Sequence, residues 1–187
     1  MCSSDLFRVG GFAGQVLQRL GVVPQQIPGG DIYPALEKGT IDAAEWIGPY
    51  DDEKLGFNKV ARYYYYPGWW EGGPALHAIV NQKALASLPP EYKAALELGA
   101  EAANTYMMAK YDAGNPQALK RLVGSGTQLR PFPRAVMDAC YKTSLEVYAE
   151  TNAKNPEFKR VSDHYFNFQR DQITWFRVTE NSFDDYM

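Results

Sequence analysis

The first twenty residues change from a short apolar run to helical spacing. Residues 7–9 are mostly apolar, and beyond them apolar side chains recur at Phe12, Val16 and Leu20. The first pattern is typical of a short strand, and the second of a helix that packs along one face. Gly21 follows as a typical residue for ending such a helix. We therefore expect a strand, a glycine turn and a helix in succession.

The alternation of strand and helix continues to residue 66. We expect a loop over 24–30, a helix over 32–38, a strand over 41–46, one or two helical turns within 50–59, and a strand over 63–66. Strands that alternate with helices are typical of a parallel or mixed sheet with helices on its faces. Because such sheets bind ligands where their strands end, we expect functional residues directly after the strands.

The second half of the chain has the spacing of long helices. We expect helices over 91–111, from Asn115-Pro116 to 123, over 135–151, and from Pro156 to about 175. Two further short strands are expected, over 75–80 and 127–130. The fold class predicted by the whole pattern is α/β in the first half and helical in the second.

The last predicted helix carries an unusually long aromatic stripe. Phe158, Val161, Tyr165 and Phe168 follow each other at spacings of three and four residues, and the stripe then extends to Trp175. One interpretation packs this stripe against its own domain. The other docks it on another domain or subunit, because it offers more apolar surface than one contact face usually absorbs.

Composition describes an ordinary folded protein. The 187 residues are 45% hydrophobic and 22% charged, with a formal net charge of −3. This charge balance disfavours nucleic acid as a partner. No apolar run approaches the roughly 18 residues of a membrane span. The first six residues also lack the features of a secretory signal, which taken alone predicts a cytoplasmic chain.

Arg8 stands where a strand is expected to end and a helix to begin. Gly10 and Gly11 follow it, and glycines allow a ligand to approach the backbone closely. Helix N-terminal amides and a guanidinium both favour a carboxylate. We expect an anion site here, and the alternative is an arginine that forms an ordinary surface ion pair.

Two glutamates follow the next two predicted strands. Glu45 and Trp46 come just before a Gly-Pro break, and Glu71 comes just after Trp69-Trp70. If the carboxylates converge, a proton, an arginine or a metal cation must relieve their repulsion. Oxygen ligands select hard ions such as Na⁺ or Ca²⁺ over zinc. The alternative is two solvated glutamates beside aromatic packing.

Paired carboxylates also allow an enzyme, namely a metal-dependent hydrolase or lyase. A glycosidase is one such option, but the chain has no G-x-S-x-G motif and no histidine pair at metal-ligand spacing. A third class is an interaction module without a small ligand. Turnover of substrate separates an enzyme from a receptor, and loss of carboxylate binding in Arg8→Ala separates a receptor from an interaction module.

Several segments together resemble one known family. Residues 29–46 read GGDIYPALEKGTIDAAEW, and the likeness continues in GPYDD at 48–52, YYPGWWEGG at 65–73, RVGG at 8–11 and QLRPF at 128–132. These segments resemble the solute-binding proteins of TRAP transporters, in the subgroup that binds 2-oxoacids and related monocarboxylates. The resemblance runs from residue 7 to the C-terminus.

The resemblance implies a function and a set of site residues. It implies a periplasmic binding protein, not an enzyme, that delivers a small carboxylate to the membrane permease subunits of a TRAP transporter. Arg8 would clamp the substrate carboxylate, and Trp46 and Glu71 would also contact the substrate. Na⁺ or Ca²⁺ would be held by the side chains of Glu45 and Glu71 and by the Trp46 carbonyl. Such a cation also binds the 2-oxo or 2-hydroxyl oxygen, which implies selectivity for 2-substituted acids.

The resemblance also implies how the chain is divided. Residues 1–6 match nothing in the family, residues 7–131 form the second α/β ligand-binding lobe with a mixed sheet and a return strand, and residues 132–187 form long C-terminal helices. Family members carry a signal peptide and a first lobe ahead of this segment. We therefore expect a fragment of an exported protein, weak ligand binding by the fragment alone, and a possible homodimer through the C-terminal helix.

Overall fold

The computed structural model describes residues 5–73 and 75–187. Its first sheet is parallel and has the strand order β2-β1-β3, with bounds Val23–Gln25, Leu6–Arg8 and Ala43–Ala44. Arg8 ends the central strand and pairs in register with Ala44. The residue after each of these strand ends therefore lies at one edge of the sheet, beside the start of the next element.

Two helices connect the strands of this sheet. α1 spans Gly11–Arg19 and α2 spans Gly29–Glu37. Two buried clusters pack these helices to the sheet: Val9, Leu17 and Val22 in one, and Ile32, Ile41 and Phe57 in the other. Burial of such apolar side chains is the main stabilising contribution to the lobe.

A second, two-stranded sheet lies beside the first. β4 spans Tyr63–Tyr66 and pairs in parallel with β5, Gln128–Pro131. Between β3 and β4 the chain forms α3, Pro49–Lys54, and a 3₁₀ turn η1, Phe57–Lys59. The predicted strands over 63–66 and 127–130 are thus confirmed. They form a sheet of their own, and all pairings among the described strands are parallel although a mixed sheet was expected.

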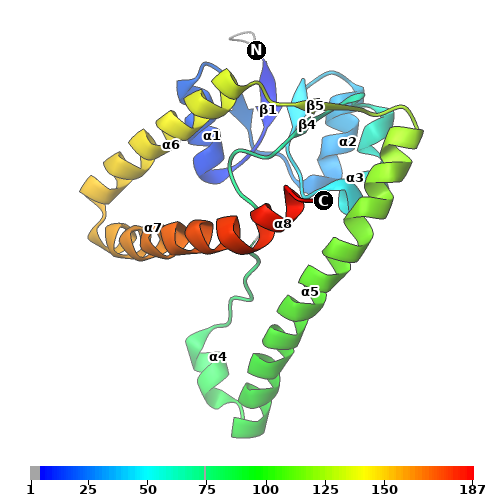
Figure 1. Ribbon diagram of the computed structural model, residues 1–187. Helices are drawn as coiled ribbons and strands as arrows, with labels where there is room; N and C mark the ends of the chain where they lie inside the picture. Colours follow the sequence, from blue (N-terminus) through cyan, green and yellow to red (C-terminus); the bar gives the residue numbers. More distant parts are fainter. Residues whose placement is uncertain (1–4, 74) are drawn as a thin grey trace.

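Long helices make up the rest of the chain. They are α4 (Gln82–Ser87), α5 (Pro90–Gly124), α6 (Arg134–Lys154), α7 (Pro156–Phe176), a π-helical turn η2 (Arg177–Asn181) and α8 (Ser182–Asp184). Figure 1 shows α5 running from the sheets out to α4, while α6 and α7 form a hairpin on the other side. The predicted helices over 135–151 and from Pro156 are confirmed.

Three expectations differ from the structure. Residues 75–80 form no strand; they are exposed, and no described strand pairs with them to satisfy their backbone groups. Part of the expected loop over 24–30 is β2, where Pro24 is tolerated because β2 is an edge strand. The helix expected to start at Asn115-Pro116 is instead the continuation of α5.

The described helices show a further common property. None of them has an apolar stretch long enough for a membrane crossing.

Candidate functional site

Arg8 is held in a fixed position at the end of β1. Its Nε donates a hydrogen bond to the Ile27 carbonyl at 3.1 Å, and its Nη1 donates one to the Glu45 carbonyl at 2.9 Å. The guanidinium carbon also lies 4.9 Å from the centre of the Trp46 ring. A guanidinium over an indole face is stabilised by a cation–π interaction. These contacts orient the positive charge at the edge of the sheet.

Glu45 forms an ion pair with this arginine. Its Oε1 lies 2.5 Å from Arg8 Nη1, and both side chains are 15% exposed. Burial raises the pKa of the Glu45 carboxyl, the Arg8 guanidinium opposes that rise, and the nearby Glu71 carboxylate adds to it. Since partial burial and a second carboxylate both disfavour its charge, Glu45 lies where additional positive charge would be stabilising.

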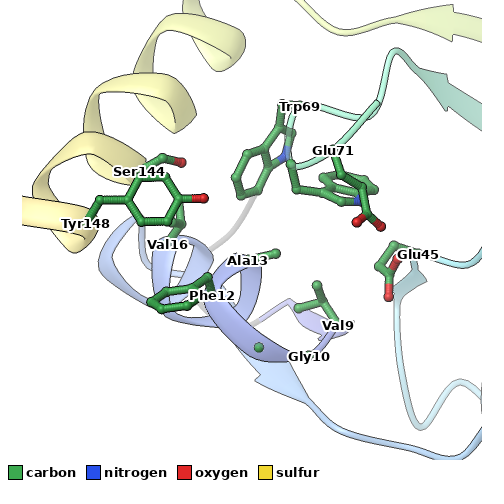
Figure 2. Close-up of a pocket in the computed structure, with 12 residues that line it drawn as sticks. Val9, Gly10, Phe12, Ala13, Val16, Glu45, Trp69, Glu71, Ser144 and Tyr148 are labelled. Atoms are coloured by element: carbon green, nitrogen blue, oxygen red, sulfur yellow. The ribbon is translucent and has the colours of Figure 1, made fainter. Parts of the chain in front are cut away.

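Glu71 approaches Glu45 from a different segment. It follows Trp69 and Trp70, whose rings meet edge to face with centroids 5.3 Å apart, and Trp69 packs on the cluster that contains Val9. Figure 2 shows the Glu71 side chain directed toward Glu45 across the pocket. The two glutamates predicted from the strand ends are therefore brought together, although Glu71 is the more exposed of the two.

Trp46 is positioned by a glycine of α2. A Cβ on Gly29 would lie only 2.5 Å from Cη2 of the Trp46 ring, so glycine is needed for the indole to lie across the start of this helix. The indole also packs on the cluster of Ile32, Ile41 and Phe57. Its side chain therefore fixes the backbone of Trp46, whose carbonyl is the predicted third ligand.

Two cavities meet at the glutamates. The smaller, about 330 Å³, is lined by Glu45 and Glu71 together with aromatic side chains that include Phe12 and Tyr148. The larger, about 1100 Å³, is lined by Arg8, the two glutamates and Trp46. All four predicted site residues thus share the larger cavity, which is large enough for a small organic anion.

The donors present fit a hard cation. Carboxylates on two segments, close enough to raise the pKa of Glu45, supply the oxygen ligands that Na⁺ and Ca²⁺ prefer. Within residues 5–73 and 75–187, no three His, Cys, Asp or Glu side chains are grouped as metal ligands. A site with two carboxylates and a main-chain carbonyl needs no third acidic side chain. The individual roles of Arg8, Glu45, Trp46 and Glu71 remain predictions.

Sequence reasoning missed two residues of the larger cavity. Asp52 of α3 is 7% exposed, and the Tyr64 hydroxyl of β4 donates a 2.6 Å hydrogen bond to its Oδ2. The predicted helical turn contained Asp52, but no signal in the local sequence marked an acidic residue there as buried. Its burial depends on β4, which is distant along the sequence.

An α/β lobe with an arginine and an acid pair at its strand ends is typical of the class of α/β proteins that bind their ligands at the edge of a parallel sheet. Comparison with known protein families identifies the family of this chain. The model of DctP, bacterial extracellular solute-binding protein, family 7, matches residues 6–155. The chain therefore belongs to this family, as the sequence resemblance to TRAP solute-binding proteins predicted.

Individual relatives of this chain are also solute-binding proteins. A monocarboxylate 2-oxoacid-binding periplasmic protein of Nostoc sp. is 47% identical over 179 residues, which are 96% of this chain and 49% of the relative. A TRAP transporter solute-binding protein from Bordetella bronchiseptica RB50 is 57% identical, with a TM-score of 0.92 over 96% of this chain and 54% of its own. That crystal structure is a mixed-occupancy dimer with copurified calcium and picolinate in one active site.

A third relative was crystallised with another acid. The TRAP periplasmic solute-binding protein of Colwellia psychrerythraea, bound to calcium and pyruvate, is 36% identical, with a TM-score of 0.93 over 98% of this chain and 56% of its own. The chain thus spans about half the length of the relatives it matches. The family and these relatives are solute-binding proteins and not enzymes, which favours the receptor interpretation over the hydrolase or lyase alternative.

Proposed function

We propose that this chain is the ligand-binding lobe and C-terminal helices of an extracytoplasmic TRAP solute-binding protein for small 2-oxo or 2-hydroxy monocarboxylates. The observation that carries the proposal is the position of the Arg8 guanidinium beside two converging carboxylates in one cavity. Relatives bound to pyruvate with calcium or sodium, and to picolinate with calcium, support it. In this arrangement the glutamate oxygens bind a cation, and the arginine binds an organic anion.

Different residues bind different parts of the ligand and its cation. Arg8 donates charge-assisted hydrogen bonds to the carboxylate, while Glu45, Glu71 and the Trp46 carbonyl hold Na⁺ or Ca²⁺. A cation held by these residues would supply positive charge for the carboxylate and for the 2-oxo or 2-hydroxyl oxygen of the ligand. A monocarboxylate without an oxygen at position 2 lacks one of these contacts, so propionate should bind more weakly than pyruvate.

Calorimetry with pyruvate and Ca²⁺ tests the proposal. Arg8→Ala should abolish binding, and Arg8→Lys should retain a small part of it, since lysine keeps the charge but not the planar fork. Arg19→Lys is a matched control on α1, because Arg19 pairs with Glu150 away from the cavity. Binding of pyruvate that is unchanged in Arg8→Ala would contradict the proposal.

Affinity should also depend on the rest of the protein. Relatives have about as much chain again as the part that matches this one. The second lobe of such a receptor closes on the ligand and excludes water, and this chain supplies one lobe. We therefore expect weak binding by the 187-residue chain, and a micromolar dissociation constant for pyruvate would contradict this expectation.

The place and partners of the protein follow from its family. We infer that the native protein is periplasmic and delivers its ligand to TRAP membrane permease subunits. Membership of an extracellular solute-binding family supports this inference, as does the periplasmic designation of the Nostoc relative. Fractionation of cells that express the native gene tests it, since recovery in the cytosol would contradict it.

We further infer that α7 contributes to a homodimer. Val161, Tyr165 and Phe168 share one face of this helix and are 59%, 57% and 58% exposed, and the Bordetella relative was crystallised as a dimer. Phe168→Asp should shift the protein to monomer in sedimentation experiments, whereas Arg170→Ala on the opposite side of the same helix should not. A wild-type protein that is monomeric at high concentration would refute this use of the face.

A further inference from the structure

Glu45 uses the donors of Arg8 that a ligand needs. Arg8 Nη1 donates to both the main-chain oxygen and the carboxylate of Glu45, and Nε donates to the Ile27 carbonyl. A carboxylate that accepts two parallel hydrogen bonds from a guanidinium uses Nη2 together with either Nε or Nη1. One of these existing partners must therefore give up its donor before Arg8 can hold a ligand in this way.

The Glu45 side chain is the partner that can move. The Ile27 carbonyl belongs to the main chain just before α2, and the Glu45 main chain is fixed by the hydrogen bond from its N–H to the Arg8 carbonyl at 3.0 Å. The Glu45 carboxylate, in contrast, lies at the end of a rotatable side chain and lines both cavities. Rotation of that side chain frees Nη1 without any change in the sheet.

The same ion pair controls the charge that an anion meets. While Glu45 is paired with Arg8, the positive charge of Arg8 is offset, and the Glu71 carboxylate nearby adds a further negative charge. An incoming carboxylate then meets one guanidinium and two carboxylates. Such a site attracts a cation and repels an anion.

We propose that Glu45 exchanges Arg8 for the cation, so that the cation and the organic carboxylate bind cooperatively. The exchange frees Nη1 of Arg8 for the ligand and at the same time restores the attraction of Arg8 for an anion. Ile27 and Trp46 keep the guanidinium in place while its partner changes. This inference rests on the proposed function and adds the order of events, in which an anion alone binds poorly and an anion with a cation binds well.

Two glutamine variants separate this exchange from direct contact between the cation and the anion. Glu45→Gln should bind pyruvate without Ca²⁺ or Na⁺ about tenfold more tightly than wild type, because Arg8 has lost its counter-charge. Added Ca²⁺ should then improve binding little. Glu71→Gln also removes a predicted cation ligand and a negative charge near the site, but it leaves the pair of Glu45 and Arg8 in place. Its cation-free affinity for pyruvate should therefore rise less than that of Glu45→Gln, by no more than about threefold over wild type.

The experiment is calorimetry of the chain with pyruvate, first in a buffer that contains a chelator and choline salts in place of sodium salts, and then with added Ca²⁺. Circular dichroism and thermal unfolding confirm that each variant is folded. Glu45→Gln that binds pyruvate no better than wild type without cation would overturn the proposal, whereas wild type that binds no pyruvate even with Ca²⁺ would contradict the proposed function itself. In wild type, pyruvate must raise the affinity for Ca²⁺ by the factor by which Ca²⁺ raises that for pyruvate. Independent binding of the two would overturn the exchange whatever the variants do.

Discussion

The Tyr64 hydroxyl donates a 2.6 Å hydrogen bond to Oδ2 of Asp52 and so joins β4 to α3 at the wall of the larger cavity. Asp52 is buried, and its other oxygen, Oδ1, accepts no hydrogen bond from a side chain of the described residues. α3 begins three residues after Trp46, which is a predicted cation ligand. The contact therefore connects the second sheet to the segment that carries part of the site.

This contact predicts a particular dependence of stability on pH. Burial raises the pKa of Asp52 from 3.8 to about 6, against the opposing effect of the Tyr64 hydrogen bond. Because the folded state binds this proton more tightly than the unfolded state, the contribution of Asp52 to stability is largest below pH 4 and is lost as the pH rises to about 6. The loss amounts to about 3 kcal/mol at most, at about 1.4 kcal/mol per pKa unit.

Asp52→Asn tests this by removing the titrating group. In urea unfolding at several pH values, the variant should gain stability relative to wild type between pH 4 and 6 and show no further gain above that range. Tyr64→Phe removes a hydrogen bond that lowers the Asp52 pKa, so the same transition should move to higher pH. Stability curves of wild type and Asp52→Asn that run parallel across this range would refute the assignment.

Gly29 and Gly30 offer a test of how Trp46 is positioned. A Cβ on Gly29 would lie 2.5 Å from Cη2 and 2.9 Å from Cζ2 of the indole, whereas one on Gly30 would have no atom within 4 Å. Gly29→Ala should displace the ring from Arg8 and lower the free energy of unfolding by about 1–3 kcal/mol. Gly30→Ala should be neutral or stabilise by up to about 1 kcal/mol.

Tryptophan fluorescence and urea unfolding measure both effects of the glycine variants. Gly29→Ala should change the emission of Trp46 and weaken pyruvate binding, and Gly30→Ala should change neither. If the two variants have equal stability and equal spectra, the close approach of the indole to α2 does not determine the position of Trp46.

The local sequence was sufficient to predict the strand ends and hence the neighbourhood of the site. Arg8 and Glu45 were expected there because strand and helix periods are properties of adjacent residues, and parallel pairing then brings these residues together. The helix α4 was missed although Asn81 is a regular N-cap, accepting hydrogen bonds from the amides of Lys83 and Ala84. That signal was present in the sequence.

Other features depend on contacts that the local sequence does not contain. A strand over 75–80 requires a partner strand, and the apolar residues there, such as Ile79 at 96% exposure, have none among the described residues. Asn115 and Pro116 read as the start of a helix, yet the Asn115 side chain caps a different helix by accepting a 3.0 Å hydrogen bond from the Tyr50 amide. Tertiary packing decides both cases.

The continuous α5 predicts opposite effects for two of its glycines. A Cβ on Gly114 would lie 2.9 Å from Cδ2 of the Tyr50 ring, which Lys54 and Tyr111 also contact, so the ring has little room to move. Gly114→Ala should therefore destabilise the chain by about 1–3 kcal/mol and loosen α3 from α5. Gly99→Ala, where a Cβ meets no atom within 4 Å, should stabilise it by about 1 kcal/mol through helix propensity alone. Urea unfolding measures both, and a stabilising Gly114→Ala would show that Tyr50 does not fix α3 against α5.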